Sequence, residues 1–342
     1  MSHRDDSSPF PGRARARALA NVALVKYFGK RDAALNLPAA GSLSIALEPL
    51  ETVTAVEFSE DLEADVVVLG GASAPEAFAA RVRRFLDLVG ELAGRRRYAR
   101  VETINSFPTG AGLASSSSGF AALALAATSA LGIDLDGLAL SALARRGSGS
   151  AARSVPGGLA LWQAGTAADG SDSFARRLVE PGDWDLRLVV GVADPGPKEV
   201  GSTEGMEHVR RTSPYYDGWV RTASADLEAA VRAVAARDLE RLGEITEDNA
   251  LAMHAAALAA RPAVAYLSGP TIEGLRVARR LRAAGIGAWF TCDAGPQPKL
   301  LCSSADEPAV ARSLGDVSGV QEVLRCRLGG GAGLVSVSGK PS

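Results

Sequence analysis

The chain has 342 residues, of which 47% are hydrophobic and 22% charged, and its formal net charge at pH 7 is -2. This balance excludes the strong overall positive charge by which many proteins bind nucleic acid or acidic membranes, although a local cationic pocket remains compatible with it. The apolar runs are broken by polar residues or glycine before they could span a bilayer, so we expect neither a nucleic-acid nor a membrane partner.

The first half of the chain predicts strands interleaved with helices. Residues 1–14 are expected to form a disordered tail, and the apolar segment ALANVALVKYFGK follows it. Runs of strand character occur at SLSIALEPL, TVTAVEF, ADVVVLG, YARVETINSFP and GLALWQAG. Helical spacing of apolar residues predicts a helix over 75–94, and LDGLALSALARRGSGSAARS predicts another. The helix between them, over 119–132, is apolar all round, which predicts that it is buried.

The second half begins a new pattern. DLRLVVGVAD predicts a strand, and helices are expected around 203–233, around 237–259 and at TIEGLRVARRLRAAG. A strand-turn-strand at GAWFTCDAGPQPKLLC, a helix at PAVARSLGDV and a strand at QEVLRCRLGG complete the chain. Helices and antiparallel-looking strands in separate blocks favour an α+β protein with two lobes, over residues 15–190 and 191–342.

Cysteine and histidine are too few and too dispersed to form a recognisable reactive or metal-binding cluster. Cys292, Cys302 and Cys326 show no CxxC spacing, and their odd number argues against a disulfide framework, so we expect buried free thiols. With three histidines there is no zinc pattern and no Ser-His-Asp signature. The chemistry is therefore expected from Asp, Lys, Arg and Ser. The N-terminal segment lacks an apolar signal core, which predicts a cytoplasmic protein.

The segment PTGAGLASSSSG, residues 108–119, lies between a predicted strand and the predicted buried helix. Glycine lets the backbone approach a ligand closely, and N–H groups at a helix start attract anions. No lysine follows the glycines as a Walker-type loop requires, so this would be a different phosphate loop. An ordinary capped helix start is the alternative. The residues predicted to bind phosphate are Gly110, Gly112, Ser115, Ser116 and Ser117.

Lysine is rare in this chain. Only five of the 37 basic residues are lysine, yet Lys26 and Lys30 both lie in the short stretch KYFGK. A compact ammonium differs from a planar guanidinium, so a point charge near phosphate or carboxylate would explain both lysines. Chance clustering is the alternative.

Four segments occur together and in order: KYFGKRDAALNLP, PTGAGLASSSSG, ARRGSGSAARS and TCDAGPQPKLL. With KEVGSTEGM as a fifth, they closely resemble the diphosphomevalonate decarboxylase family of the GHMP kinase superfamily. The resemblance runs from about Ala20 to Leu301. It implies a two-lobed GHMP-kinase-like fold, with an N-terminal lobe like ribosomal S5 domain 2 and a ferredoxin-like C-terminal lobe.

The resemblance also implies a reaction. ATP phosphorylates the tertiary 3-hydroxyl of (R)-5-diphosphomevalonate, and loss of phosphate and CO2 then gives isopentenyl diphosphate and ADP. Phosphate leaves a tertiary carbon far better than hydroxide does. Catalysis would then consist mainly of positioning and electrostatics, with ATP and Mg2+ as cofactors. No Asp-x-Asp or similar cluster identifies the Mg2+ ligands, which stay unassigned. A homodimer is implied by resemblance alone.

Site roles follow residue by residue from the resemblance. Asp293 orients or deprotonates the 3-hydroxyl, helped by Lys26, whose ammonium would lower the pKa of that carboxylate. Arg153 is expected to hold the substrate carboxylate, because its fork fits two oxygens. The remaining residues expected to contact the substrate are Tyr27, Lys30, Ser148, Ser150 and Ser202.

Simpler structural roles compete for some of these residues. Asp293 opens the turn DAGP and could bond its own turn backbone. Ser202 could be a helix N-cap. For Arg145 and Arg146, solvated arginines at a helix end are the better interpretation.

The chain departs from the family pattern at three places. Phe28 stands where the family usually has Trp, and Cys292 where it usually has Phe, which suggests packing changes. Ala40 and Gly41 replace Asn and Ser, and so remove side-chain donors from a loop near the expected site. Decarboxylation of 5-phosphomevalonate is therefore an alternative activity, and a 3-kinase or a non-catalytic ligand sensor is a more distant one.

Overall fold

The computed structural model describes residues 12–107, 115–193 and 201–336. Two long antiparallel strands, β1 (Arg13–Val25) and β4 (Ser42–Phe58), form the centre of the N-terminal lobe. Their sheet is widened by shorter strands, and a separate hairpin follows β1. The sheet strands are β5 (Val66–Leu69), β6 (Ala72–Ser73), β7 (Ala99–Asn105), β8 (Leu159–Trp162) and β9 (Ala175–Val179), and the hairpin is β2 (Lys30–Asp32) with β3 (Leu37–Pro38).

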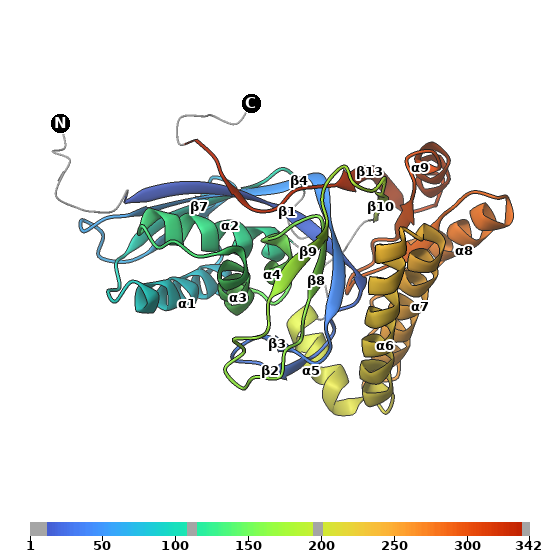
Figure 1. The fold of residues 1–342 in the computed structure, drawn as a ribbon, viewed down its shortest axis with the longest axis horizontal. Helices are drawn as coiled ribbons and strands as arrows, with labels where there is room; N and C mark the ends of the chain where they lie inside the picture. Colours follow the sequence, from blue (N-terminus) through green and yellow to red (C-terminus); the bar gives the residue numbers. More distant parts are fainter. Residues whose placement is uncertain (1–11, 108–114, 194–200, 337–342) are drawn as a thin grey trace.

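Helices cover one face of this sheet (Figure 1). They are α1 (Glu76–Leu92), α2 (Ser115–Ala130), α3 (Gly137–Gly147) and α4 (Ala151–Ser154). As predicted from its uniformly apolar sequence, α2 is buried along most of its length. Its first turn carries the serine run, and Ser118 Oγ lies 2.6 Å from the hydroxyl of Thr52 on β4. The start of α2 is thereby fixed against the sheet.

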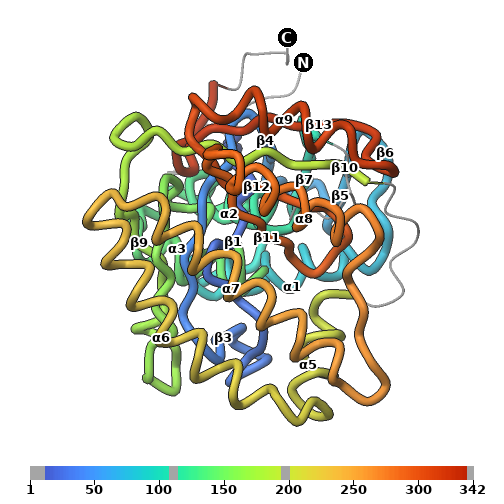
Figure 2. The backbone as a smooth tube through the Cα atoms, turned by 90° about the vertical axis from the view of Figure 1, so that its right-hand side faces the viewer, coloured from blue at the N-terminus to red at the C-terminus, as the bar shows by residue number. Residues whose placement is uncertain are grey.

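The C-terminal lobe is built on four antiparallel strands in the order β13-β10-β12-β11. Along the chain they follow a strand-helix-strand-strand-helix-strand pattern, which is the ferredoxin-like arrangement expected from the resemblance. The strands are β10 (Arg187–Ala193), β11 (Trp289–Thr291), β12 (Lys299–Cys302) and β13 (Val320–Leu328). The helices are α5 (Ser202–Thr212), α6 (Tyr216–Ala236), α7 (Leu239–Leu258), α8 (Gly269–Ala283) and α9 (Glu307–Gly315). Helices α6 and α7 run side by side and form one side of the molecule (Figure 2).

The two lobes share one continuous sheet. Strand β13 pairs with β4 at Arg327 opposite Glu48 and Leu328 opposite Leu47. After β13 the chain returns to the N-terminal lobe, where β14 (Gly333–Leu334) pairs with β1. The predicted boundary near residue 190 falls within β10 and stays a prediction, because no gap in the sheet marks it.

Several elements differ from their predicted limits. Strand β1 begins at Arg13, inside the segment expected to be a disordered tail. The two strands expected at SLSIALEPL and TVTAVEF form the single strand β4, because the pairing with β1 continues past a register shift near Pro49 and needs no N–H from proline. The helix expected over LDGLALSALARRGSGSAARS is broken into α3 and α4 at Ser148, and the helix around 203–233 is broken at Pro214.

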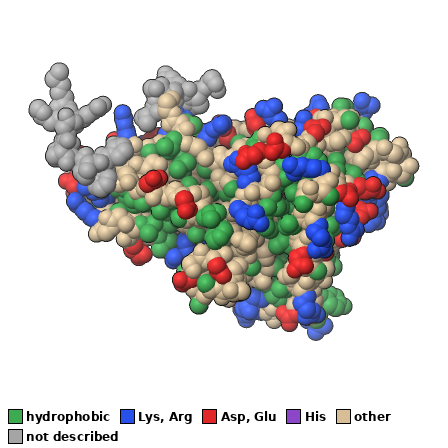
Figure 3. All heavy atoms as spheres, in the orientation of Figure 1, with side chains coloured by type: hydrophobic (Ala, Val, Ile, Leu, Met, Phe, Trp, Pro, Cys, Tyr) green, Lys and Arg blue, Asp and Glu red, His purple; other side chains and the backbone are tan. Residues whose placement is uncertain are grey.

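Side chains of opposite charge are interspersed on the face of the described residues seen in Figure 3. Because the charges are mixed, the described part of the face in Figure 3 carries no large patch of a single sign. None of the helices in the described ranges combines the length and apolar character that crossing a membrane requires.

Candidate functional site

A cavity of about 980 Å³ lies between the two lobes. Its walls come from the segment after β1, from α1, from the start of α2, from the turn between α3 and α4, from α5 and from the loop after β11. Basic side chains outnumber acidic ones. The basic residues are Lys26, Lys30, Arg81, Arg84, Arg146 and Arg153, and the acidic ones are Asp87, Glu204 and Asp293. In a chain of net charge -2, this local excess of positive charge suits a highly anionic ligand.

Asp293 lines the cavity and lies between two lysines. Lys26 Nζ lies 2.8 Å from Oδ1 of Asp293, and Lys299 Nζ lies 3.3 Å from Oδ2. Both lysines are 1% exposed. Burial by itself would raise the pKa of Asp293, but the two ammonium groups outweigh it and hold that pKa well below its usual range. Asp293 is therefore ionised at neutral pH.

Lys26 is held in place by two hydrogen bonds besides its ion pair with Asp293. Its Nζ donates a 2.8 Å hydrogen bond to the carbonyl oxygen of Ala23. Its backbone N–H donates to Oδ1 of Asn249 on α7 at 2.8 Å, and Nδ2 of Asn249 donates to Asp226 on α6 at 2.8 Å. Burial lowers the pKa of Lys26, and attraction to Asp293 raises it again. The C-terminal lobe thus fixes the backbone of a residue that belongs to the N-terminal lobe.

Arg153, on α4, is 4% exposed and lines the cavity. Its Nε donates to Oδ1 of Asn21 at 3.1 Å, and its Nη1 donates to Oγ of Ser42 at 2.9 Å. The guanidinium carbon lies 5.9 Å from the ring centre of Tyr27 and 5.7 Å from that of Trp162. Burial lowers the pKa of Arg153 to about 10, so the group remains a cation at neutral pH.

The break between α3 and α4 brings Ser148, Gly149 and Ser150 to the cavity wall. A side chain at Gly149 would clash with Tyr27, because a Cβ atom there would lie 2.4 Å from its hydroxyl oxygen. That hydroxyl is buried and has no hydrogen-bond partner among the described residues. Burial also raises the pKa of Tyr27, which keeps the hydroxyl neutral. A neutral hydroxyl without a partner is suited to a hydrogen bond with a bound ligand.

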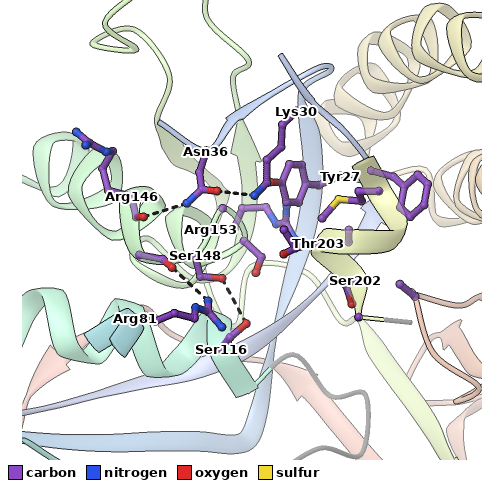
Figure 4. Close-up of a pocket in the computed structure, with 18 of the residues that line it drawn as sticks. Tyr27, Lys30, Asn36, Arg81, Ser116, Arg146, Ser148, Arg153, Ser202 and Thr203 are labelled. Carbon is purple, nitrogen blue, oxygen red and sulfur yellow. Dashed lines mark hydrogen bonds between the residues drawn. The ribbon is translucent and has the colours of Figure 1, made fainter. Parts of the chain in front are cut away.

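Lys30 belongs to a chain of hydrogen bonds along one wall (Figure 4). Its Nζ donates to Oδ1 of Asn36 at 2.7 Å, and Nδ2 of Asn36 donates to the carbonyl oxygen of Arg146 at 2.9 Å. Asn36 has a φ of 52°, a left-handed conformation that asparagine tolerates better than most residues. The β2–β3 hairpin is thereby joined to the C-terminal end of α3.

Of the residues predicted to bind phosphate, Ser115 and Ser116 line the cavity. Ser116 Oγ lies 3.3 Å from Oγ of Ser148 (Figure 4). Ser117 is buried and is not among the lining residues. Gly110 and Gly112 lie outside the described residues. The first turn of α2 therefore presents its positive dipole end beside the cationic wall.

Ser202 also lines the cavity, and it is the first residue of α5. The N-cap position is occupied by Gly201, so the alternative of an N-capping role for Ser202 is wrong. Ser202 is exposed and does not cap the N-terminus of α5.

The expectation that Arg145 and Arg146 are solvated is wrong for both residues. Arg145 is 3% exposed, and its guanidinium donates to the carbonyl oxygens of Leu35, Gly170 and Ser173. Burial lowers its pKa to about 10. Arg146 is partly buried and lines the cavity. Helix-end arginines become buried here because a loop and a hairpin, remote in sequence, fold over them.

Replacing Arg145 with alanine is expected to lower the free energy of unfolding by about 3 kcal/mol, because three buried carbonyl oxygens would lose their donor. Denaturant unfolding followed by circular dichroism would measure this change. The matched control is Arg146→Ala, which should leave the stability nearly unchanged and act instead on ligand affinity. Equal loss of stability in the two variants would show that the carbonyl contacts of Arg145 are unimportant.

The departures at Ala40 and Gly41 concern packing rather than the cavity wall. Neither residue is among those that line the cavity. Ala40 is buried beside Phe28, and a Cβ atom at Gly41 would lie 2.6 Å from Leu227 on α6. Phe28 packs edge-on against Trp219 and Tyr266, and it also lines the cavity, so this departure concerns the cavity wall as well as packing. All three cysteines are buried and free, also as expected.

Several side chains in or behind this site escaped the sequence analysis. They are Asn36, Arg81, Lys299 and Asn249. Only Lys299 had a usable signal, since it is one of five lysines in the chain and lies in the segment TCDAGPQPKLL. The others reach the site through tertiary contacts that spacing does not reveal. Within the described ranges, no group of three His, Cys, Asp or Glu side chains could hold a metal ion.

Two family models match the chain. One describes a diphosphomevalonate decarboxylase-like N-terminal domain and matches residues 18–175, and the other describes a mevalonate 5-diphosphate decarboxylase C-terminal domain and matches residues 188–329. Diphosphomevalonate decarboxylase of Candida albicans is 32% identical, over 87% of this chain and 86% of that protein. The enzyme of the same name from Homo sapiens is 34% identical, over 81% of this chain and 73% of that protein.

Solved structures agree with this similarity over almost the whole chain. Mevalonate diphosphate decarboxylase from Staphylococcus aureus has a TM-score of 0.90 at 35% identity, and 95% of this chain covers 98% of that one. A second structure describes mevalonate diphosphate mediated ATP binding by the mevalonate diphosphate decarboxylase from Enterococcus faecalis. It has a TM-score of 0.88 at 37% identity, and the match covers 95% of this chain and 99% of that one. A structure of MDDEF in complex with MVAPP, AMPPCP and magnesium has a TM-score of 0.89 at 39% identity, with 95% and 99% covered.

Proposed function

The chain belongs to the diphosphomevalonate decarboxylase family, and from this premise we propose that it catalyses the ATP-dependent decarboxylation of (R)-5-diphosphomevalonate. The products are isopentenyl diphosphate, ADP, phosphate and CO2. The observation that carries the proposal is the ion pair between Asp293 and Lys26 in the wall of a cavity with an excess of basic side chains. Such a cavity can hold two anionic molecules and still offer one acceptor for a hydroxyl proton.

In the first step the 3-hydroxyl oxygen of the substrate attacks the γ-phosphorus of ATP, and the bond to ADP breaks. Asp293 accepts a hydrogen bond from this hydroxyl and aims its oxygen at phosphorus. Because Lys26 and Lys299 hold the pKa of Asp293 low, it is a weak base in the free protein. The proton therefore passes to it only as the new oxygen–phosphorus bond forms and makes the hydroxyl acidic.

In the second step the phosphate leaves carbon 3 with the electron pair of the carbon–oxygen bond. The electron pair of the bond between carbon 2 and the carboxylate moves to form the carbon–carbon double bond, and CO2 is released. We assign Arg153 to the substrate carboxylate, because it is a buried cation that lines the cavity close to Tyr27. A fixed guanidinium can hold the two carboxylate oxygens with the breaking bond in a constant orientation.

The diphosphate is assigned to the wall formed by Tyr27, Lys30, Ser148, Ser150 and Ser202, all of which line the cavity. The unpartnered hydroxyl of Tyr27 and the ammonium of Lys30 supply donors of the kind that phosphate oxygens accept. The ATP phosphates are assigned to the first turn of α2, with Ser115 and Ser116, and to the preceding residues Gly110 and Gly112. The positive end of the α2 dipole favours this assignment.

Magnesium fits this arrangement as a companion of ATP. Because the described residues contain no acidic cluster, phosphate oxygens, water and hydroxyl groups would supply most of its ligands. When bound, Mg2+ neutralises part of the phosphate charge during transfer. The residues of this chain then need only position the phosphates and the hydroxyl.

The test is to incubate the purified protein with ATP, Mg2+ and either 5-diphosphomevalonate or 5-phosphomevalonate and to measure ADP and CO2 together. Equal amounts of ADP and CO2 from the diphosphate are expected. Turnover of the monophosphate alone would reassign the substrate, ADP without CO2 would indicate a 3-kinase, and no turnover of either ester would favour a ligand sensor.

We further propose that the protein is a cytoplasmic homodimer. The dimer rests on the family resemblance, and the location rests on the need for ATP and on three buried cysteines kept as free thiols, as in a reducing compartment. Light scattering coupled to size-exclusion chromatography would test the dimer against the chain mass of 35.2 kDa.

A further inference from the structure

We propose that Lys299 is a positioning residue that holds one oxygen of the Asp293 carboxylate from outside the cavity, so that the other oxygen faces the reacting hydroxyl. The role in catalysis rests on the proposed function, whereas the contact between the two side chains does not.

Lys299 occupies a buried position in the sheet, where an unpaired ammonium group would destabilise the fold. It is the first residue of β12, between β10 and β11, and it stands opposite Val190 on one side and Thr291 on the other. Its three successors, Leu300, Leu301 and Cys302, are all fully buried. A buried ammonium is strongly unfavourable unless it is paired, so the pairing with Asp293 explains how the strand accommodates it.

The two lysines reach Asp293 from different lobes and have different surroundings. Lys26 comes from the end of β1, contacts Oδ1 and lines the cavity. Lys299 contacts Oδ2 and is not among the residues that line the cavity. Its other polar contact is a 3.4 Å hydrogen bond to the carbonyl oxygen of Gln297, in the loop that carries Asp293. Lys26 thus borders the space expected to hold substrate and phosphate, whereas Lys299 contacts Asp293 from outside the cavity lining.

The other charged and titratable groups around Asp293 do not substitute for Lys299. Arg153 approaches from α4 and attracts Asp293 through space, but it forms no ion pair with it. His254, on α7, has its Nε2 3.2 Å from the carbonyl oxygen of Cys292, and burial lowers its pKa to about 4, so it is neutral. Besides Lys26, Lys299 is the cation that pairs with this carboxylate in the described structure.

The activity test compares Lys299→Met, which removes the charge at similar length, with Lys299→Arg, which keeps it. We expect Lys299→Met to lower kcat by about tenfold or more and to leave the KM for ATP within about threefold. Lys299→Arg should keep kcat closer to the wild-type value, because it retains the cation beside Asp293. An unchanged kcat in Lys299→Met, or an equal loss of kcat in both variants, would overturn the proposal.

A double-mutant cycle in melting temperature tests the contact without using activity. In the wild-type background, Lys299→Met should lower the melting temperature, because Asp293 loses a partner. In the Asp293→Asn background the same change should raise it, because a buried cation without its carboxylate is removed. The same shift in both backgrounds, or a double variant that does not fold, would mean that Lys299 serves packing alone. The cycle remains decisive if the decarboxylase assay itself fails.

Discussion

Replacement of Asp293 by asparagine is expected to lower kcat by about 10³-fold and to leave the KM for ATP within about threefold. The amide keeps the shape of the side chain but removes the anion that aligns the hydroxyl and receives its proton. It also leaves Lys26 and Lys299 as two buried cations without their carboxylate. Initial rates of ADP and CO2 release, measured together on the purified variant, would check this expectation.

The matched control is Asp87→Asn, which makes the same change of charge at another cavity residue. Asp87 pairs with Arg96 at 2.7 Å and has no contact with either lysine. Its loss should alter kcat by less than about threefold. If both variants lost activity equally, the total charge of the cavity would matter and the specific role of Asp293 would be wrong.

The stability of Asp293→Asn should depend on pH in a defined direction. Burial alone would raise the pKa of Asp293, but Lys26 and Lys299 lower it well below its usual range. A group with a lowered folded pKa stabilises the fold above its unfolded pKa, about 3.9, and this contribution is lost as the pH falls from there toward the folded pKa. The wild-type protein should therefore be more stable than the variant at pH 7, and the difference should shrink below about pH 4. Denaturant unfolding at several pH values would measure it.

The sequence was informative wherever a residue's role depended on its neighbours along the chain. The apolar run over 119–132 predicted a buried helix, and the glycines and serines before it predicted a helix start at a binding cavity, where Ser115 and Ser116 lie. The rarity of lysine singled out Lys26, which lies 2.8 Å from Asp293 although 267 positions separate them. That pairing was expected from the family resemblance, because spacing in the sequence cannot bring such distant residues together.

The sequence did not predict the burial of residues that are covered by segments remote along the chain. Arg145 reads as an exposed residue at a helix end, and it is buried only because the loop containing Gly170 and Ser173 folds over it. The sequence indicates only that Lys299 follows a turn in a strand segment. The structure shows that its ammonium group pairs with Asp293. SLSIALEPL and TVTAVEF were expected as two strands, and only the pairing with β1 on both sides of a register shift shows that they form the single strand β4.

Replacement of Arg153 by methionine is expected to lower kcat/KM for the mevalonate ester by about 10²- to 10³-fold, with ADP and CO2 still formed in equal amounts. Methionine fills much of the same volume but cannot bind a carboxylate. The variant is also expected to melt at or above the wild-type temperature, because Arg153 is a buried cation without an ion-pair partner in the described structure. Kinetics and thermal melts of the same preparation would check both expectations.

Ser42→Ala is the matched control for this variant. It removes the 2.9 Å hydrogen bond to Nη1 of Arg153 but keeps the cation and its bond to Asn21. We expect kcat/KM to fall by less than about tenfold, because the guanidinium loses orientation and retains its charge. A large loss of melting temperature in Arg153→Met, with an unchanged KM for the ester, would instead assign Arg153 to the fold. Gain of stability with loss of activity is the expected result for a buried cation kept for its ligand, since its neutral partners Asn21 and Ser42 do not balance its charge as a bound carboxylate would.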